Sequence, residues 1–361
     1  MIYNIKLHVL TPIHIGCDES YKPTEFVIDS DKNTLIHFNL WQFIEIFDEK
    51  EWKRLMEISQ KKSSMALVEL YRFYASMREK VKGREIPIPK EFSERYRQVK
   101  QLKNDNEILK EFNQFEIPRT YFNPYTQRPI IPGSSLKGSL RTGYLSGIRR
   151  EFPEKEKIKD KKSDELEEIL LGGKMGTDPF RFFKVSDFES QNNVKTKIMY
   201  QVNVHKLKNQ SRQSLSVPLE VIPEGNVFEA TVKVDIPLQN SGIRKPINFK
   251  ELLLKVHSHY AGIFNKEIDL RKQKGFRMPN VSSFSPLKQK FFLIRLGKHS
   301  GAEAVTIEGV RNIRVRTKEG FKNQDSPTTI WLASEEKKLS NLSRAIPFGW
   351  VMLEVVNADK L

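Results

Sequence analysis

The sequence is poor in cysteine and has no long apolar run. Its 361 residues include a single cysteine, Cys17, which excludes an internal disulfide and a cysteine-rich zinc site and fits a reducing compartment. No run reaches the roughly eighteen apolar residues that a membrane-spanning helix needs. The first ten residues alternate apolar and polar side chains, as a strand does and a signal peptide does not. We therefore expect a cytoplasmic protein that makes no membrane contact.

The sequence also lacks the motifs of familiar enzyme classes. A P-loop is absent, because Lys137 is not followed by the hydroxyl residue that binds Mg²⁺. Ser135 does not stand in a nucleophile elbow. Of the seven histidines only His257 and His259 are close in sequence, and two positions apart on a helix they would point to different sides. We therefore expect no metal, no cofactor and no nucleotide hydrolysis.

Negative charge is scarce beside positive charge. The chain has 61 Lys and Arg against 45 Asp and Glu, which gives a formal net charge of +16. Such an excess favours a polyanionic partner. The basic residues are dispersed over the whole chain, whereas a membrane anchor would cluster them, so the pattern favours nucleic acid over an anionic membrane.

The central stretch, residues 129–150, joins a loop to a helix and contains no carboxylate. The loop ends at Gly133, and the spacing of Leu136 and Leu140 predicts a helix after it. The first amides of a helix lack intrahelical partners and its N-terminus is electropositive, so this turn is suited to binding a phosphate. The residues expected to contact a phosphate chain are Gly133, Ser134, Ser135, Lys137 and Arg141. The alternative is an ordinary capped helix whose basic side chains are solvated.

Alternation and helical spacing predict both strands and helices along the chain. The expected strands are residues 1–10, 25–28, 34–38, 180–188, 199–206, 216–222, 228–236, 291–296, 307–315 and 350–356. The expected helices are residues 40–78, with a break near 61–64, then 90–115 and 248–265. Residues 155–168 carry charges of both signs and few apolar side chains, so we expect a solvated insertion there.

Two further segments combine basic residues with a turn. The strands at 199–206 and 216–222 flank a segment too long for a tight turn, which predicts a projecting hairpin with a basic tip. Residues 295–301 form a glycine-bounded loop that can offer amides to a phosphate, although a flexible connector explains the glycines equally well. The nucleic-acid contacts expected here are Lys206, Lys208, Arg212, Arg295, Gly297, Lys298, His299, Ser300 and Gly301.

His14 is the one candidate for catalysis. A histidine beside a basic nucleic-acid groove can act as general acid or base in metal-free RNA cleavage. That chemistry needs a second group near an aligned 2′-hydroxyl, and the sequence does not place one. The competing interpretation is that His14 caps a turn or contacts RNA without catalysis.

Four short motifs occur in an order typical of one family. They are residues 11–16 (Thr-Pro-Ile-His-Ile-Gly), 131–141 (Ile-Pro-Gly-Ser-Ser-Leu-Lys-Gly-Ser-Leu-Arg), 297–301 together with 304–309, and 347–351 (Pro-Phe-Gly-Trp-Val). Through these motifs the chain resembles the RAMP superfamily of CRISPR-associated proteins, and within it the fifth subunit of type III-A Csm effector complexes. The resemblance covers both ends and the centre of the chain.

The resemblance implies an α+β fold of two ferredoxin-like (RRM/RAMP) domains with helical insertions and a projecting β-hairpin. The implied domains are residues 1–175, with a helical insertion at 40–115, and 176–361. It further implies a non-catalytic RNA-binding subunit that caps the filament at the 3′ part of the guide RNA and contributes to guide maturation in antiviral defence. The implied partners are guide RNA, with target RNA as a further candidate, neighbouring Csm filament subunits, and host nucleases that trim guides. Two alternatives stay open: a metal-independent endoribonuclease acting through His14, and a scaffold that meets RNA only through its neighbours.

Overall fold

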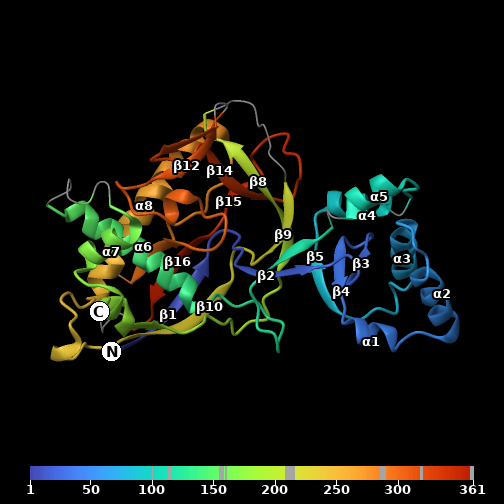
Figure 1. The fold of residues 1–361 in the computed structure, drawn as a ribbon, viewed down its shortest axis with the longest axis horizontal. Helices are drawn as coiled ribbons and strands as arrows, with labels where there is room; N and C mark the ends of the chain where they lie inside the picture. Colours follow the sequence, from blue (N-terminus) through green and yellow to red (C-terminus); the bar gives the residue numbers. More distant parts are fainter. Residues whose placement is uncertain are drawn as a thin grey trace.

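The structure is a computed structural model in which helices and sheets alternate along the chain (Figure 1). It describes residues 1–99, 101–112, 115–153, 158, 161–207, 216–284, 290–317 and 320–357. Strands and helices both occur in the N-terminal and C-terminal halves, so the predicted α+β class is confirmed. None of the helices in these ranges is long and apolar enough to cross a membrane.

The largest sheet is five-stranded and antiparallel. Its order is β11 (Phe291–Arg295), β16 (Trp350–Val355), β1 (Ile2–Val9), β10 (Val227–Val234) and β7 (Phe183–Val185). The opening strand is central, because Leu7 pairs with Phe228 on one side and with Leu353 on the other. The sheet thus mixes strands from both sides of residue 175, and the predicted division into domains 1–175 and 176–361 stays a prediction. The chain ends meet beside it, where the Asn4 amide donates to Asn357 Oδ1 at 2.9 Å (Figure 1).

Two helices, α6 (Gly133–Glu151) and α8 (Phe249–Lys274), pack together beside this sheet. Leu140 of α6, Val256 of α8 and Leu7 of β1 belong to one buried apolar cluster. The helices approach closely at Gly147, where an added Cβ would lie 2.6 Å from Cβ of Lys255. The predicted helix over 248–265 is therefore correct in place but continues for more than two further turns.

The second sheet is four-stranded. Its order is β15 (Ile346–Pro347), β14 (Thr329–Ser334), β8 (Lys197–His205) and β9 (Val217–Val221). β8 and β9 pair antiparallel, which confirms the two strands of the predicted hairpin. Its tip, with Lys208 and Arg212, lies outside the described residues.

The N-terminal insertion forms a lobe to one side of the two sheets (Figure 1). Its elements are β3 (Phe26–Asp29), β4 (Thr34–His37), α1 (Leu40–Ile44), α2 (Glu49–Ser59), α3 (Met65–Ser76), β5 (Arg84–Pro87), α4 (Lys90–Val99) and α5 (Asp105–Phe112). One cluster of buried side chains, including Val27 and Phe73, lies within the lobe, and a second joins Tyr96 of α4 to Val202 of β8 in the four-stranded sheet. The break near 61–64 is confirmed, but the segment before it contains two helices, α1 and α2, where one was predicted. The single helix predicted over 90–115 is also wrong, because α4 and α5 are separate helices.

The remaining elements connect these bodies. They are β2 (Gly16–Tyr21) paired with β6 (Ile117–Thr120), α7 (Ser163–Leu171), β12 (Ile313–Thr317) paired with β13 (Gly320–Gln324), and 3₁₀ helices at Met175–Thr177, Pro179–Phe182, Gln239–Ser241 and Ala302–Ala304. The strand predicted over 307–315 begins only at Ile313, because Glu308 and Gly309 bond to α6 instead. The solvated insertion predicted over 155–168 is partly wrong, since Leu166 of α7 is buried.

Candidate functional site

Three of the four sequence motifs meet through main-chain hydrogen bonds. The Lys298 amide donates to the carbonyl oxygen of His14 at 2.9 Å, and the Gly349 amide donates to that of Pro12 at 2.9 Å. The Leu296 amide closes the set by donating to the Gly349 carbonyl at 2.8 Å. Segments from the two ends of the chain therefore form one rigid unit, here called the motif cluster: residues 11–16, 295–301 and 347–351.

The fourth motif, which begins α6, adjoins this cluster through side chains. The Ser139 hydroxyl donates to the Arg295 carbonyl at 3.0 Å. The buried Tyr260 hydroxyl of α8 bonds to the carbonyls of Ser139 and Ala304, each at 3.1 Å. The structure thus brings all four motifs together, although the first three are each more than a hundred residues apart in sequence.

Two glycines permit the close contacts of the cluster. Gly297 has a φ of 84°, and a Cβ there would lie 2.6 Å from the His14 carbonyl oxygen. Gly349 also has a φ of 84°, and a Cβ there would collide with the Leu296 carbonyl oxygen. Glycine is required at both positions because other residues rarely adopt this backbone conformation and have no room. Gly297 therefore shapes the loop, and its predicted contact with RNA stays a prediction.

The N-terminus of α6 is already occupied. The Gly133 amide donates to Asp187 Oδ1 at 2.8 Å, and a Cβ on Gly133 would lie 2.6 Å from the Ser186 carbonyl oxygen. The Ser135 amide donates to the Pro132 carbonyl at 2.9 Å. The predicted open phosphate site at Gly133 is therefore wrong: a carboxylate takes the first amide and would repel a phosphate.

Arg141 is engaged inside the protein as well. Its guanidinium lies 2.7 Å from Asp178 and 2.6 Å from Glu167, so these carboxylates balance its charge, and its contact with RNA stays a prediction. Ser134 is exposed and Lys137 is half-buried, and their contacts with RNA stay predictions. Burial lowers the pKa of the Lys137 amine, while Asp178 opposes that shift.

The loop 295–301 is divided between the core and the surface. Arg295 is only 3% exposed, forms an ion pair with Glu267, and donates from Nε to the Phe348 carbonyl at 2.9 Å. Ser300 is also buried. These two residues were predicted to contact RNA, and the structure contradicts this because neither can be reached. Lys298 is exposed and lies over Gly16, so it remains the candidate of this loop.

The hairpin and the end of the loop add little accessible charge. Lys206 lies 2.9 Å from Glu303, a carboxylate that is itself 9% exposed. This ion pair balances the charge of Lys206, and its predicted contact with RNA stays a prediction. Gly301 has a φ of 86° and begins the 3₁₀ turn at 302–304.

His14 lies inside the motif cluster. It is 1% exposed, and its Nδ1 is 2.8 Å from the Glu220 carbonyl oxygen. Burial lowers the pKa of His14, and it also lowers the pKa of His299, to about 4. The two rings are stacked, with their centres 6.2 Å apart. Both imidazoles are neutral near pH 7, and His14 holds the cluster together rather than presenting a ring to a substrate. In the described part of the chain, no group of three or more His, Cys, Asp or Glu side chains could hold a metal ion.

The open face of the five-stranded sheet is the surface that an RRM uses for RNA. Here Lys6 is bound to Glu229 at 2.8 Å across strands β1 and β10. A groove of about 490 Å³ on this face is also lined by Asp187 and Glu189. Its carboxylates would repel phosphates, so this face is unsuited to RNA.

Most of the chain, including the motifs at 11–16 and 131–141, matches the model of a known family. The family model of the RAMP superfamily matches residues 6–295. The chain belongs to the RAMP superfamily. Among solved structures, this RAMP protein is similar to a chain in the cryo-EM structure of a Csm-crRNA-target RNA ternary complex of a type III-A CRISPR-Cas system, with a TM-score of 0.63 and 19% identity over 98% of this chain and 100% of that one. The crystal structure of T. onnurineus Csm5 gives a TM-score of 0.53 and 16% identity over 96% and 99%.

No curated protein sequence matches this RAMP protein. At these identities the two structural likenesses concern the fold. The predicted resemblance to the RAMP superfamily is confirmed by the family match, and the fold is that of Csm proteins.

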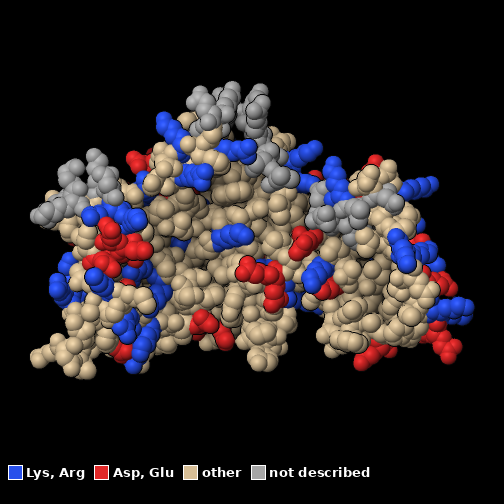
Figure 2. All heavy atoms as spheres, in the orientation of Figure 1, with Lys and Arg blue, Asp and Glu red and all other residues tan. Residues whose placement is uncertain are grey.

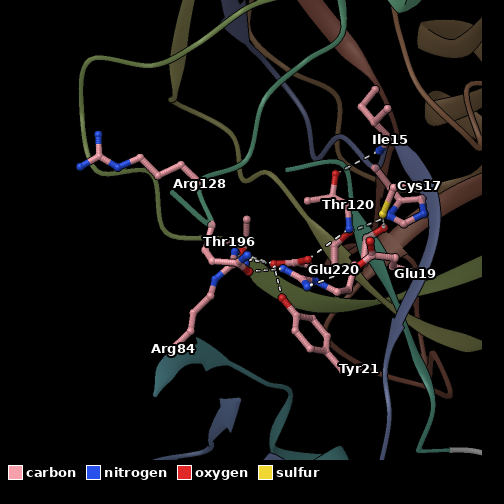
Figure 3. Close-up of polar contacts among 12 residues, drawn as sticks. Ile15, Cys17, Glu19, Tyr21, Arg84, Thr120, Arg128, Thr196 and Glu220 are labelled. Atoms are coloured by element: carbon pink, nitrogen blue, oxygen red, sulfur yellow. Dashed lines mark hydrogen bonds and ion pairs between the residues drawn. The ribbon is translucent and has the colours of Figure 1, made fainter. Parts of the chain in front are cut away.

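Sequence reasoning missed the buried carboxylate of Glu220, the residue of this RAMP protein whose main-chain carbonyl binds His14. Glu220 is completely buried, and its Oε1 accepts hydrogen bonds from Tyr21 at 3.0 Å, Arg84 at 2.7 Å and Thr196 at 2.5 Å (Figure 3). Its Oε2 accepts from the Thr120 amide at 3.1 Å. Burial and the nearby carboxylate raise the pKa of Tyr21. A single acidic residue within the otherwise apolar strand Val217–Val221 was the available signal.

Proposed function

We propose that this RAMP protein is a non-catalytic RNA-binding subunit of a type III-A Csm-type ribonucleoprotein. In this role it caps the filament at the 3′ part of the guide RNA and contributes to guide maturation. Support comes from the family membership and from the fold shared, over nearly the whole of both chains, with a subunit of a Csm-crRNA-target RNA complex and with Csm5. Guide RNA, target RNA and neighbouring Csm-type subunits are its proposed partners.

The motif cluster is the observation that carries the proposal. Its main-chain bonds fix the loop 295–301, and the exposed side chain of Lys298 lies on its surface. A cation on a rigid loop can hold a sugar-phosphate chain without reading bases, so any guide sequence is accepted. The net charge of +16 supports the same class of partner.

We assign no catalytic residue. His14 was the candidate for RNA cleavage, and its ring is buried with Nδ1 engaged by the Glu220 carbonyl. General acid or base catalysis requires hydrogen-bond reach to the substrate. Purified protein should therefore leave a guide precursor intact, and cleavage that is lost in a His14→Ala variant would contradict this assignment.

The proposed role is tested in the assembled complex. Csm-type subunits and a guide precursor are co-expressed with and without this chain, and the guides are sequenced at their 3′ ends. We expect the tagged chain to co-purify with guide RNA, and complexes without it to carry guides of altered 3′ length. Unchanged guide ends and no co-purification would refute the proposal.

Lys298→Glu is expected to weaken binding of single-stranded RNA by about tenfold or more, because it replaces an attractive phosphate contact with a repulsive one. Lys53→Glu is the matched control, since Lys53 is exposed on α2 and the change in net charge is the same. Fluorescence anisotropy with labelled RNA measures both variants. Equal losses in the two would indicate an effect of net charge and contradict a local contact.

A further inference from the structure

The strands β12 and β13 form a short antiparallel pair with two different faces. Arg316 is paired with Phe321, and Arg314 with Asn323. Directly paired residues of an antiparallel ladder lie on the same face, so these four side chains share one face. Ile313, on the opposite face, is 9% exposed and packs toward the body of the protein. The face with Arg314, Arg316 and Phe321, here called the Arg–Phe face, is therefore directed outward.

An aromatic ring is exposed on this face. Phe321 is 61% exposed, and the guanidinium carbon of Arg314 lies 4.0 Å from the centre of its ring. The cation covers part of the ring and orients it. A large apolar ring in water gains nothing for the fold, but it offers a planar surface to another planar group.

The cations of this pair of strands have no carboxylate partner in the described part of the chain. Among the described residues, no carboxylate forms an ion pair with Arg314, Arg316 or Lys322. This differs from Arg141, Arg295 and Lys206, each of which is bound to a carboxylate of the protein. Figure 2 shows Lys and Arg gathered over the upper part of the molecule, where Figure 1 labels β12, β14 and β8, with few Asp or Glu among them. Among the described residues, Arg314 and Arg316 are therefore the cations that the Arg–Phe face offers to a ligand.

We propose that the Arg–Phe face binds single-stranded RNA, with a base stacked on Phe321 and phosphates held by Arg314 and Arg316. Alternating cations and aromatic rings are the features by which proteins hold single strands, because every base has a flat face and every nucleotide a phosphate. A base within a duplex has both faces covered, so the ring selects unpaired nucleotides. This site rests on the proposed RNA-binding function and adds a contact surface separate from the motif cluster.

The stacking contact is tested by changing the ring alone. The full-length chain and its Phe321→Leu and Phe321→Trp variants are titrated against a labelled single-stranded RNA of mixed sequence. Leucine keeps an apolar side chain but removes the stacking surface, so we expect a loss of affinity of about tenfold, whereas tryptophan retains binding. Thermal unfolding of each variant confirms that the fold is intact. Wild-type affinity in Phe321→Leu overturns the stacking contact.

The two faces of the hairpin supply a matched pair of charge variants. Arg316 lies on the Arg–Phe face, while Lys322 pairs with Val315 and lies on the opposite face. Both side chains are exposed, and each alanine substitution removes one positive charge. We expect Arg316→Ala to weaken binding by several-fold and to reduce the salt dependence by about one phosphate contact, and Lys322→Ala to do neither. Equal effects of the two variants overturn the assignment to this face.

The outcomes separate this proposal from the proposed function. If Lys298→Glu loses RNA while the Phe321 and Arg316 variants bind as the wild type does, the RNA-binding function stands and the Arg–Phe face fails. If the wild-type chain does not bind single-stranded RNA, both fail. Equal affinity of the wild type for duplex RNA, with the same loss in Phe321→Leu, would overturn the preference for unpaired bases.

Discussion

Glu220 is a fully buried carboxylate that joins several segments of the chain. It accepts hydrogen bonds from Tyr21 of β2, Arg84 of β5, Thr120 of β6 and Thr196 before β8 (Figure 3). A buried charge is tolerated only when it is paired and its lone pairs are satisfied. The main-chain carbonyl of Glu220 also binds His14 of the motif cluster. Through its side chain and its carbonyl together, Glu220 links the insertion lobe to that cluster.

Glu220→Gln is expected to lower the free energy of unfolding by about 2–4 kcal/mol, because the guanidinium of Arg84 is left without its counter-charge. Urea unfolding measures the loss. Glu224→Gln is the control: its partner Arg277 lies 3.4 Å away and both side chains are about half exposed, so the loss should stay below about 1 kcal/mol. Similar losses in the two variants would show that Glu220 is not a buried anchor.

His259 provides a residue-level test against pH. Burial, followed by the positive charge of Arg311, lowers its pKa to about 4, and neither ring nitrogen has a hydrogen-bond partner. In the unfolded chain the ring takes up a proton near pH 6.5, but in the folded protein only near pH 4. The free energy of unfolding should therefore fall as the pH falls from about 6.5 to 4, by up to about 3 kcal/mol from this residue, and gain nothing above pH 6.5.

The measurement compares the wild type with His259→Gln in urea at several pH values. The variant should lose less stability between pH 6.5 and 4, since glutamine does not titrate. The other buried histidines remain in both proteins, so the difference isolates this ring. Parallel curves would mean that His259 is protonated in the folded state at its ordinary pKa.

At this scale, the sequence identified the motif residues but not their partners. Lys137 and Arg141 were assigned together from helical spacing, yet Glu167 and Asp178, from segments later in the chain, neutralise only Arg141. Asp187 blocks Gly133 in the same way. Long-range ion pairs depend on how the chain folds back, and periodicity within one helix contains no information about that.

Among the elements, amphipathic spacing predicted the position of most strands and helices. It failed where contacts distant in sequence decide the structure, as at Glu308 and Gly309, which bond to Ser146 and Arg149 of α6 instead of extending β12. It also missed that α6 packs against α8 through a stripe of glycines. Gly143 and Gly147 face Val256 and Lys255, so the two backbones come close together.

Gly147→Ala tests this packing. In an exposed helix the change from glycine to alanine stabilises by up to about 1 kcal/mol, but here the new methyl would lie 2.6 Å from Lys255 Cβ. We expect a net loss of about 1–3 kcal/mol in the free energy of unfolding. Gly138→Ala in the same helix is the control, since nothing lies within 4 Å of its Cβ, and it should be neutral or stabilising. A stabilised Gly147→Ala protein would refute close packing of α6 on α8.

For the whole molecule, the class of fold was predictable and the strand order was not. No local sequence pattern predicts that the first strand lies between β10 and β16. The order of the strands depends instead on which apolar faces pack against one another in the folded chain. The family motifs gave part of this missing information, because they occur near both ends of the chain. In the structure they meet at the hydrogen bond between Pro12 and Gly349. The net charge follows from the composition alone, and it is the whole-molecule property on which the proposed RNA binding depends.

The net charge of +16 predicts how the whole protein should respond to salt. Phosphate contacts release counterions, so with about three to four contacts to a single strand the affinity should fall by roughly thirtyfold between about 50 and 200 mM salt. Because phosphates are the same in every RNA, unrelated sequences should give similar affinities and parallel slopes on a log–log plot. Anisotropy titrations of several RNAs at several salt concentrations measure both quantities. A strong preference for one sequence, or an affinity indifferent to salt, would mean that bases or apolar contacts, and not the basic surface, hold the RNA.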